Sequence, residues 1–165
     1  MAIHFSIPSM LQESLVEMFL VARDCINFRK DPKTWKSHGC YGYPAAILLF
    51  AIADSIGSYV IGGNTRQHFD ILNHKGYYNL NLDKKSIDII YERYRCLLTH
   101  NAVLATNTVL DIGGKSYPVF KIQNNISYIY LKSFLKTTKV ALEKFLQNVE
   151  STVWNSNQLQ EILKK

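Results

Sequence analysis

Two side chains near the end of a predicted helix have the types and the spacing for phosphate chemistry. Arg95 and His100 stand five positions apart, with apolar Leu97 and Leu98 between them. Histidine titrates near neutrality, so His100 can act as a general base or a general acid. A guanidinium keeps its charge and can grip two phosphate oxygens, so Arg95 can stabilise negative charge that builds up on a phosphate. The pair therefore supplies the groups that metal-free cleavage of a phosphodiester requires.

The residues around this pair extend the pattern. Residues 90–101 read IYERYRCLLTHN and contain R-x-x-x-x-H late in a long amphipathic helix. This pattern resembles the signature of HEPN domains, which are helical bundles that often act as metal-independent ribonucleases. The run is also similar to a group of bacterial HEPN-like proteins. These carry an apolar second helix with an internal Asp, here Asp54 after Ala53, and the order of elements agrees over about residues 5–150.

The resemblance implies a function and a set of roles. The chain would be an endoribonuclease that leaves 2′,3′-cyclic phosphate ends and uses no metal or organic cofactor. Arg95 would bind the phosphate, His100 would transfer the proton, and Asp54 would orient Arg95. Two protomers would pair their motifs across a shared cleft, which implies a homodimer. A toxin or defence effector of the bacterial cytoplasm, with a protein antitoxin as its partner, agrees with the same resemblance.

A second interpretation keeps the fold and omits the catalysis. Cys96 follows the arginine at a position where active HEPN members commonly carry a polar Asn, Asp or His, and a thiol hydrogen-bonds poorly. The domain would then be a non-catalytic helical bundle that binds a nucleotide, RNA or a protein partner. Arg95 would pair with Asp54 or Glu92 to hold the bundle together, and His100 would be an exposed or capping residue at the helix end.

Helical geometry separates the two residues of the motif. Five positions along an ideal helix turn through about 500°, which leaves Arg95 and His100 roughly 140° apart around the axis. One regular helix therefore cannot aim both side chains at a single phosphate. Either the helix is distorted near Thr99, or a second subunit completes the site. The second alternative is a further reason to expect a homodimer.

A carboxylate within an apolar helix requires a partner, because an unpaired buried charge is costly. Asp54 lies among apolar residues, and Arg95 is its predicted partner, with Arg93 as the next choice. Four further residues are predicted to contact RNA, although lysines of this kind are more often part of a solvated helix face. They are Arg93, Asn101, Lys132 and Lys136. Six tyrosines offer faces on which bases can stack, or else belong to the core or anchor loops; they are Tyr41, Tyr43, Tyr77, Tyr78, Tyr91 and Tyr94.

Composition and charge narrow the class of protein. The 165 residues carry a formal charge of +6, which attracts polyanions and makes RNA a suitable partner. Three widely spaced cysteines form no disulfide framework and indicate a reducing compartment, so we expect a cytoplasmic protein. Residues 1–8 lack the pattern of a secretory signal. Asp54 interrupts the one long apolar run, residues 43–61, which argues against a membrane span.

Hydrophobic periodicity predicts a single domain over residues 1–165 that is mainly α. We expect a bundle of four to five helices with a small β-hairpin inserted before the last long helix. Residues 29–42 are predicted to be a loop, and residues 109–112 and 117–122 should pair as the hairpin across Gly113 and Gly114. A third short strand, residues 126–130, would follow a turn at Asn124 and Asn125, and Pro118 would mark an edge strand. The four long helices are predicted at about residues 8–26, 44–59, 84–100 and 131–149, with a short helix at 64–72 and a weaker one at 155–165.

Overall fold

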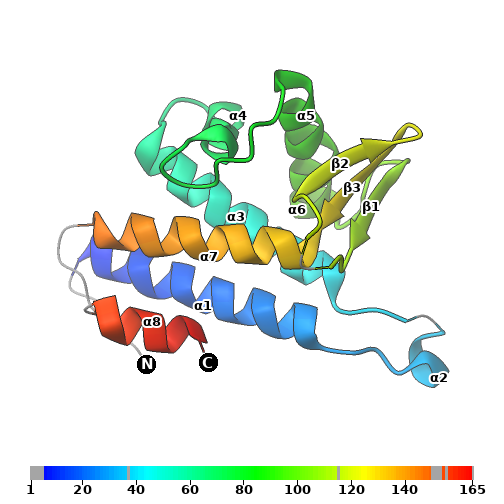
Figure 1. The fold of residues 1–165 in the computed structure, drawn as a ribbon, viewed down its shortest axis with the longest axis horizontal. Coiled ribbons are helices and arrows are strands. Elements are labelled where there is room, and N and C mark those ends of the chain that lie inside the picture. The colour runs from blue at the N-terminus through cyan, green and yellow to red at the C-terminus, as the bar shows by residue number, and fades with distance from the viewer. Residues whose placement is uncertain (1–5, 37, 115, 150–153, 155, 165) are drawn as a thin grey trace.

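The computed structural model describes residues 6–36, 38–114, 116–149, 154 and 156–164. The chain is mainly helical and carries a small sheet before its last long helix, which confirms the predicted fold class (Figure 1). Two predictions fall partly outside the described residues. They are the absence of a secretory signal in residues 1–8 and the helix at residues 155–165. The elements in chain order are α1 (Ile7–Asn27), α2 (Pro32–Trp35), α3 (Gly42–Val60), α4 (Thr65–His68), η1 (Phe69–Asn73), α5 (Lys84–Ile89), η2 (Ile90–Cys96), α6 (Leu97–Asn101), β1 (Thr108–Asp111), β2 (Phe120–Gln123), β3 (Ile126–Tyr130), α7 (Leu131–Gln147) and α8 (Ser156–Lys164).

Three long helices form the core of the bundle. α1 and α7 run alongside each other, and α3 packs against both (Figure 1). α1 begins earlier than predicted, because Ser6 caps it by accepting a hydrogen bond from the backbone N–H of Ser9. The apolar faces of the three helices meet in side chains that are almost fully buried, and each large one contributes about 1.5–3 kcal/mol through burial. They include Leu15, Phe19, Leu49, Phe50, Phe134 and Leu142.

α3 is the element whose apolar character most needs explanation. By length and composition alone, it is long and apolar enough to cross a membrane. In this fold it packs between α1, α7, α4 and η1, and 44% of the residues in its most apolar stretch are buried inside the protein. A central helix of a bundle is apolar over much of its surface because several neighbouring elements pack against it.

The segment that carries the motif is continuous but not uniform. α5, η2 and α6 follow one another without a break, and η2 is a π-helix over Ile90–Cys96. π-helical turns are rare and often coincide with functional sites. Asp83 caps the start of α5 by accepting a hydrogen bond from the backbone N–H of Ser86 at 2.6 Å. α4, which precedes this segment, begins with the capping box that Asn64 and Gln67 predict.

The sheet has a different pairing from the predicted one. Its order is β1-β3-β2, with β1 parallel and β2 antiparallel to β3. The predicted hairpin across Gly113 and Gly114 is therefore wrong, because β1 does not pair with β2. The hairpin is formed by β2 and β3 across Asn124 and Asn125, whose φ angles of 51° and 61° match a tight turn that needs two positive φ values. Pro118 precedes β2, which is an edge strand as predicted.

One buried side chain joins the sheet to the motif segment. Tyr94 of η2 is fully buried, and its hydroxyl donates a hydrogen bond to the carbonyl oxygen of Ser127 in β3 at 2.6 Å. Burial raises the pKa of Tyr94, so the hydroxyl remains a donor at neutral pH. η2 is thereby held against the sheet on one side, and its other residues are free to face α3.

Two short helices complete the fold. α8 packs on α7, and the predicted loop at residues 29–42 contains the short helix α2.

Candidate functional site

An ion pair joins the apolar helix α3 to the π-helical segment η2. Arg95 Nη2 donates a hydrogen bond to Asp54 Oδ2 at 2.7 Å, across 41 positions of sequence. The predicted partner of Asp54 is therefore confirmed as Arg95, whereas Arg93 lies exposed on the same segment. The side chains of Asp54 and Arg95 remain 19% and 18% exposed, so the carboxylate is mostly rather than fully buried. Part of the guanidinium can still meet a solvent-borne anion.

A third residue, His68 at the end of α4, holds the second oxygen of Asp54. Its Nδ1 lies 2.7 Å from Asp54 Oδ1, and its Nε2 lies 3.2 Å from the carbonyl oxygen of Gly63. Both neighbours present oxygen atoms to the ring, and the tautomer of the imidazole decides which ring nitrogen donates. Asp54 is therefore fixed from two sides, by His68 and by Arg95. Sequence reasoning did not identify His68.

The close approach of α4 to α3 depends on Gly57, which lies one turn after Asp54. A Cβ atom at position 57 would lie 2.1 Å from the carbonyl oxygen of His68, far inside any allowed contact. The missing side chain lets the end of α4 rest on α3 and brings the imidazole to Asp54. A glycine one turn after a buried carboxylate was the available sequence signal for this packing, because it allows another backbone to approach closely.

The surroundings of Arg95 keep its side chain charged and in place. Its guanidinium carbon lies 5.8 Å from the ring centre of Tyr91, in cation–π range. Desolvation acts to lower the pKa of Arg95, but the hydrogen bond and charge of Asp54, together with Cys96, raise it above its ordinary value. Cys96, a free thiol, also contacts Tyr91, and hydrogen bonding between them, with desolvation, raises the pKa of Tyr91. Cys96 thus borders the guanidinium.

His100 lies in a different environment from Arg95. It is exposed in the last turn of α6, which ends at Ala102 in a left-handed conformation. The predicted distortion near Thr99 is wrong, because the π-helical turn spans Ile90–Cys96 and the chain is regular α-helix from Leu97 to Asn101. Arg95 lies within the irregular turn, whereas His100 lies in the regular helix that follows it. Within one chain, Arg95 faces α3 and His100 faces solvent.

The residues predicted to contact RNA are all exposed and lie on two separate parts of the fold. Arg93 belongs to η2 and Asn101 ends α6, so they flank the motif along one helical segment. Asn101 is exposed and does not pack into the core. Lys132 and Lys136 lie on the outer face of α7. The structure therefore brings Asp54 and Arg95 into direct contact and places the other predicted site residues on open surface.

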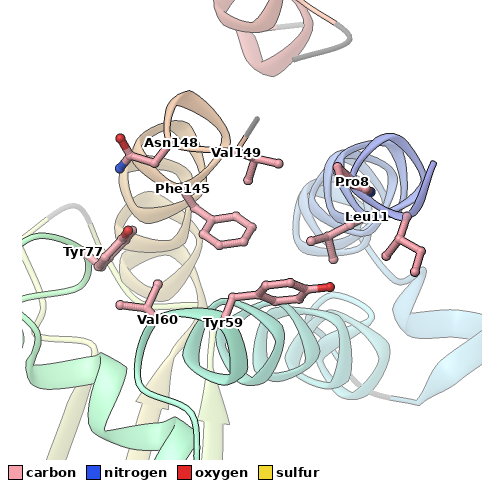
Figure 2. A pocket seen from close by; sticks show the side chains of 9 residues that line it. Pro8, Leu11, Tyr59, Val60, Tyr77, Phe145, Asn148 and Val149 are labelled. Atoms are coloured by element: carbon pink, nitrogen blue, oxygen red, sulfur yellow. The ribbon is translucent and has the colours of Figure 1, made fainter. Parts of the chain in front are cut away.

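A cavity of about 660 Å³ lies elsewhere, at one end of the bundle (Figure 2). Phe145 of α7 points into the space between the three long helices, and Tyr59 of α3 forms its floor, with ring centres 5.9 Å apart. Apolar residues make up most of the remaining wall, including Pro8, Leu11, Val60 and Val149. No charged residue is among its described lining, so this cavity is unsuited to phosphate chemistry.

Two further observations bear on identity. Within the described ranges of the chain, no group of three or more His, Cys, Asp or Glu side chains is arranged to hold a metal ion. Comparisons of the chain with protein-family models, with curated proteins and with solved structures gave no significant match. The function must therefore be inferred from the site itself. There, Arg95 on the π-helical turn contacts the carboxylate of Asp54, whose other oxygen contacts His68.

Proposed function

We propose that this chain is an HEPN-like, metal-independent endoribonuclease, in which Arg95 binds the scissile phosphate and His100 transfers the proton. The observation that carries the proposal is the 2.7 Å contact between Asp54 and Arg95. An internal carboxylate of α3 contacts the arginine of R-x-x-x-x-H, and this contact supports the orienting role that the resemblance implies for Asp54. His68 extends the arrangement, because it fixes the carboxylate from its other oxygen.

The proposed reaction uses one positive charge and one titratable group. A base removes the proton of a ribose 2′-hydroxyl, the 2′ oxygen bonds to phosphorus, and the 5′ oxygen leaves and takes up a proton. The products are a 2′,3′-cyclic phosphate and a free 5′-hydroxyl. Arg95 stabilises the charge that accumulates on the phosphate oxygens, because Asp54 occupies only part of its fork of N–H donors. His100 supplies the proton transfer.

The orientation of His100 makes a second subunit part of the proposal. Because Arg95 faces α3 and His100 faces solvent, one phosphate reaches both kinds of group only if two motifs meet about a two-fold axis. We therefore propose a homodimer whose interface includes η2 and α6. Multi-angle light scattering should give twice the mass of the chain, and a monomer at the concentrations that cleave RNA would contradict this interface.

The catalytic proposal is tested with purified protein and end-labelled single-stranded RNAs of varied sequence, in buffer containing EDTA. We expect cleavage by the unmodified chain, with 3′ ends identified by mass spectrometry as cyclic phosphates. His100→Ala should lower the rate by about 10²–10⁴-fold, the usual cost of a lost acid–base group. Arg95→Ala should lower it by a comparable factor, since a fixed donor at a charged transition state is worth about 10²–10³-fold.

Two controls separate chemistry from folding. His74→Ala removes another exposed histidine, which contacts the backbone N–H of Gly76 and the ring of Tyr77, and should leave the rate unchanged. Melting curves must show that Arg95→Ala remains folded, because its partner Asp54 would be left with a single hydrogen-bond donor. The catalytic proposal fails if the unmodified chain cuts none of the RNAs, or if His100→Ala cuts them equally well.

The same contacts also favour a second candidate function. Asp54 offsets the charge of Arg95, and Cys96 stands where active relatives carry a better hydrogen-bonding group. A non-catalytic bundle that binds RNA, a nucleotide or a protein such as an antitoxin would keep this geometry as a structural brace. Binding of RNA without cleavage, unaffected by His100→Ala, would favour this function. A toxin or defence role in the bacterial cytoplasm belongs to the catalytic proposal.

A further inference from the structure

A projecting segment between α1 and α3 carries an unusual share of the positive charge. We call residues 28–36 and 38–41 the basic-aromatic segment. It contains four cations, Arg29, Lys30, Lys33 and Lys36, and one acid, Asp31, in a chain whose formal charge is +6. Figure 1 shows α2 at the tip of this segment, set apart from the bundle. The projecting segment is therefore accessible to a large partner.

Three aromatic rings contact one another in this segment. Phe28 and Tyr41 are stacked with centroids 4.2 Å apart and planes inclined by 8°, and Trp35 meets Tyr41 edge-on at 5.7 Å. Tyr41 is the inner ring of the three. The outer two, Phe28 and Trp35, are 41% and 48% exposed. Each therefore presents part of an aromatic side chain to solvent.

The cations of the segment differ in what they already bind. Arg29 Nη1 donates to the carbonyl oxygens of Ile26, Asn27 and Phe28, so its charge completes the end of α1. Lys30 lies over Trp35, with Nζ 4.9 Å from the ring centre. Lys33 and Lys36 are exposed, and no ion pair engages either of them within the described part of the chain. These two lysines therefore remain available to an anionic partner.

The segment is held in shape by its own backbone. Lys30 N–H donates to the carbonyl oxygen of Gly39 at 2.9 Å, and Tyr41 N–H donates to that of Cys25 at 3.1 Å, which closes the base of the projection. Asp31 caps α2 through the backbone N–H of Lys33 and the hydroxyl of Thr34, so the single acid of the segment is directed into α2. The backbone that carries the rings and the lysines is therefore ordered before any ligand arrives, which lowers the entropic cost of binding.

We propose that the basic-aromatic segment is a docking site for single-stranded RNA, in which bases stack on Phe28 and Trp35 while Lys33 and Lys36 contact phosphates. Exposed rings interleaved with unpaired cations are the combination that binds single strands, because every base has a face to stack and every nucleotide carries a charge. A base-paired duplex hides its base faces and should bind less well. The site shares its substrate class with the proposed ribonuclease, but it is tested by binding rather than by cleavage.

The test measures fluorescence anisotropy of a labelled oligouridine of about 12 nucleotides, a length typical of such sites. Binding is measured in a His100→Ala background, so that cleavage does not intervene. We expect Trp35→Ala to weaken binding by about 5- to 150-fold, the loss expected from one stacked base. Replacing both Lys33 and Lys36 with Ala should reduce the slope of log affinity against log salt by about 1.4, which corresponds to two phosphate contacts on a single strand.

A direct readout of stacking comes from Trp35 itself. The chain has two tryptophans, so Trp154→Phe isolates the fluorescence of Trp35. Oligouridine should quench this fluorescence, and the matched duplex should not. The control for charge is the double replacement Lys84→Ala and Lys85→Ala, which removes two exposed lysines from the first turn of α5 and leaves the segment intact. This control should retain the binding of the parent protein.

The outcomes separate this proposal from the catalytic one. RNA binding that is unaffected by Trp35→Ala and by the Lys33 and Lys36 replacements overturns the docking site and leaves the ribonuclease intact. Binding that depends on these residues, without any cleavage by the unmodified chain, supports the docking site and removes the ribonuclease. Equal affinity for duplex and single strand overturns the stacking role. Binding to anionic phosphatidylserine vesicles but not to RNA would assign the segment to a membrane surface instead.

Discussion

The Asp54 cluster and the basic-aromatic segment use charge in opposite ways. Asp54, His68 and Arg95 come from three different elements, and His68 and Arg95 each lie 2.7 Å from Asp54, mostly away from water. In the basic-aromatic segment, by contrast, Lys33 and Lys36 lie close in sequence, exposed to solvent. The contrast shows that charges which bind each other fix the position of helices, whereas unpaired charges at the surface are available to a partner.

This difference should appear in stability measurements. Changes in the Asp54 cluster alter contacts between α3, α4 and η2 and should therefore affect folding. Changes at Lys33 and Lys36 remove no described ion pair and should affect folding little, because surface substitutions of this kind usually stay within about 0.5 kcal/mol. Substitutions can therefore test whether the first region is structural and the second is reserved for binding.

The largest effect is expected from Gly57→Ala. The new Cβ atom would lie 2.1 Å from the carbonyl oxygen of His68, and backbone cannot rotate away as a side chain can. We expect a net loss of about 3 kcal/mol in the free energy of unfolding, at the upper end of the range for overpacking. Urea denaturation followed by circular dichroism measures this loss. α4 would have to move, so the contact between His68 and Asp54 should be lost as well.

Gly62→Ala is the matched control for that prediction. Gly62 ends α3 with φ of 72°, and a Cβ atom there would meet nothing within 4 Å. Only the left-handed backbone conformation is penalised, by about 1–2 kcal/mol. If both glycine variants lose the same stability, close packing of α4 on α3 is not what position 57 provides.

Asp54→Asn should have the next largest effect. An amide presents an oxygen to one donor and its NH₂ group to the other, so either His68 or Arg95 loses its acceptor. We expect a loss of about 2 kcal/mol, because a hydrogen bond between charged groups is worth about 1.5–3 kcal/mol and the site is partly open to water. Thermal melts at matched pH check this loss. The double replacement of Lys33 and Lys36 by Ala, with its expected change within about 0.5 kcal/mol, is the comparison.

The smallest change at neutral pH is expected from Asp83→Asn, which lies outside both regions. The backbone and side-chain hydrogen bonds from Ser86 lower the pKa of the Asp83 carboxyl below its ordinary value of 3.8. Its stabilising effect is therefore present above pH 3.8 and is lost as the pH falls through the lower folded-state value. Asparagine caps a helix about as well but has no charge to lose.

Melting temperatures of the parent protein and Asp83→Asn should therefore differ slightly at pH 6 to 7 and converge as the pH falls below about 3.8. The convergence has this direction because only the aspartate takes up a proton in that range. A difference that widens towards low pH would show that Asp83 is not the acceptor for Ser86 in solution.

Sequence reasoning predicted much of the helical fold and one contact of the site. The apolar periodicity of α1, α3 and α7 located the core, since a helix that must bury one face repeats apolar residues every three or four positions. Asp54 could be matched with Arg95 because a carboxylate in an apolar helix needs a cation, and few cations lie on the neighbouring helix. His68 could not be found this way, because a short polar helix gives no indication of which neighbour its last residue will meet.

Local signals determined the elements of this protein, and tertiary packing decided how they combine. The turn at Asn124 and Asn125 and the caps of α4 and α5 all follow from interactions within a few residues. The parallel pairing of β1 with β3, the π-helical turn at Ile90–Cys96 and the contact of His68 with Asp54 do not. Each of these depends on surfaces that meet only after the chain has folded, because the energy that selects them comes from residues distant in sequence.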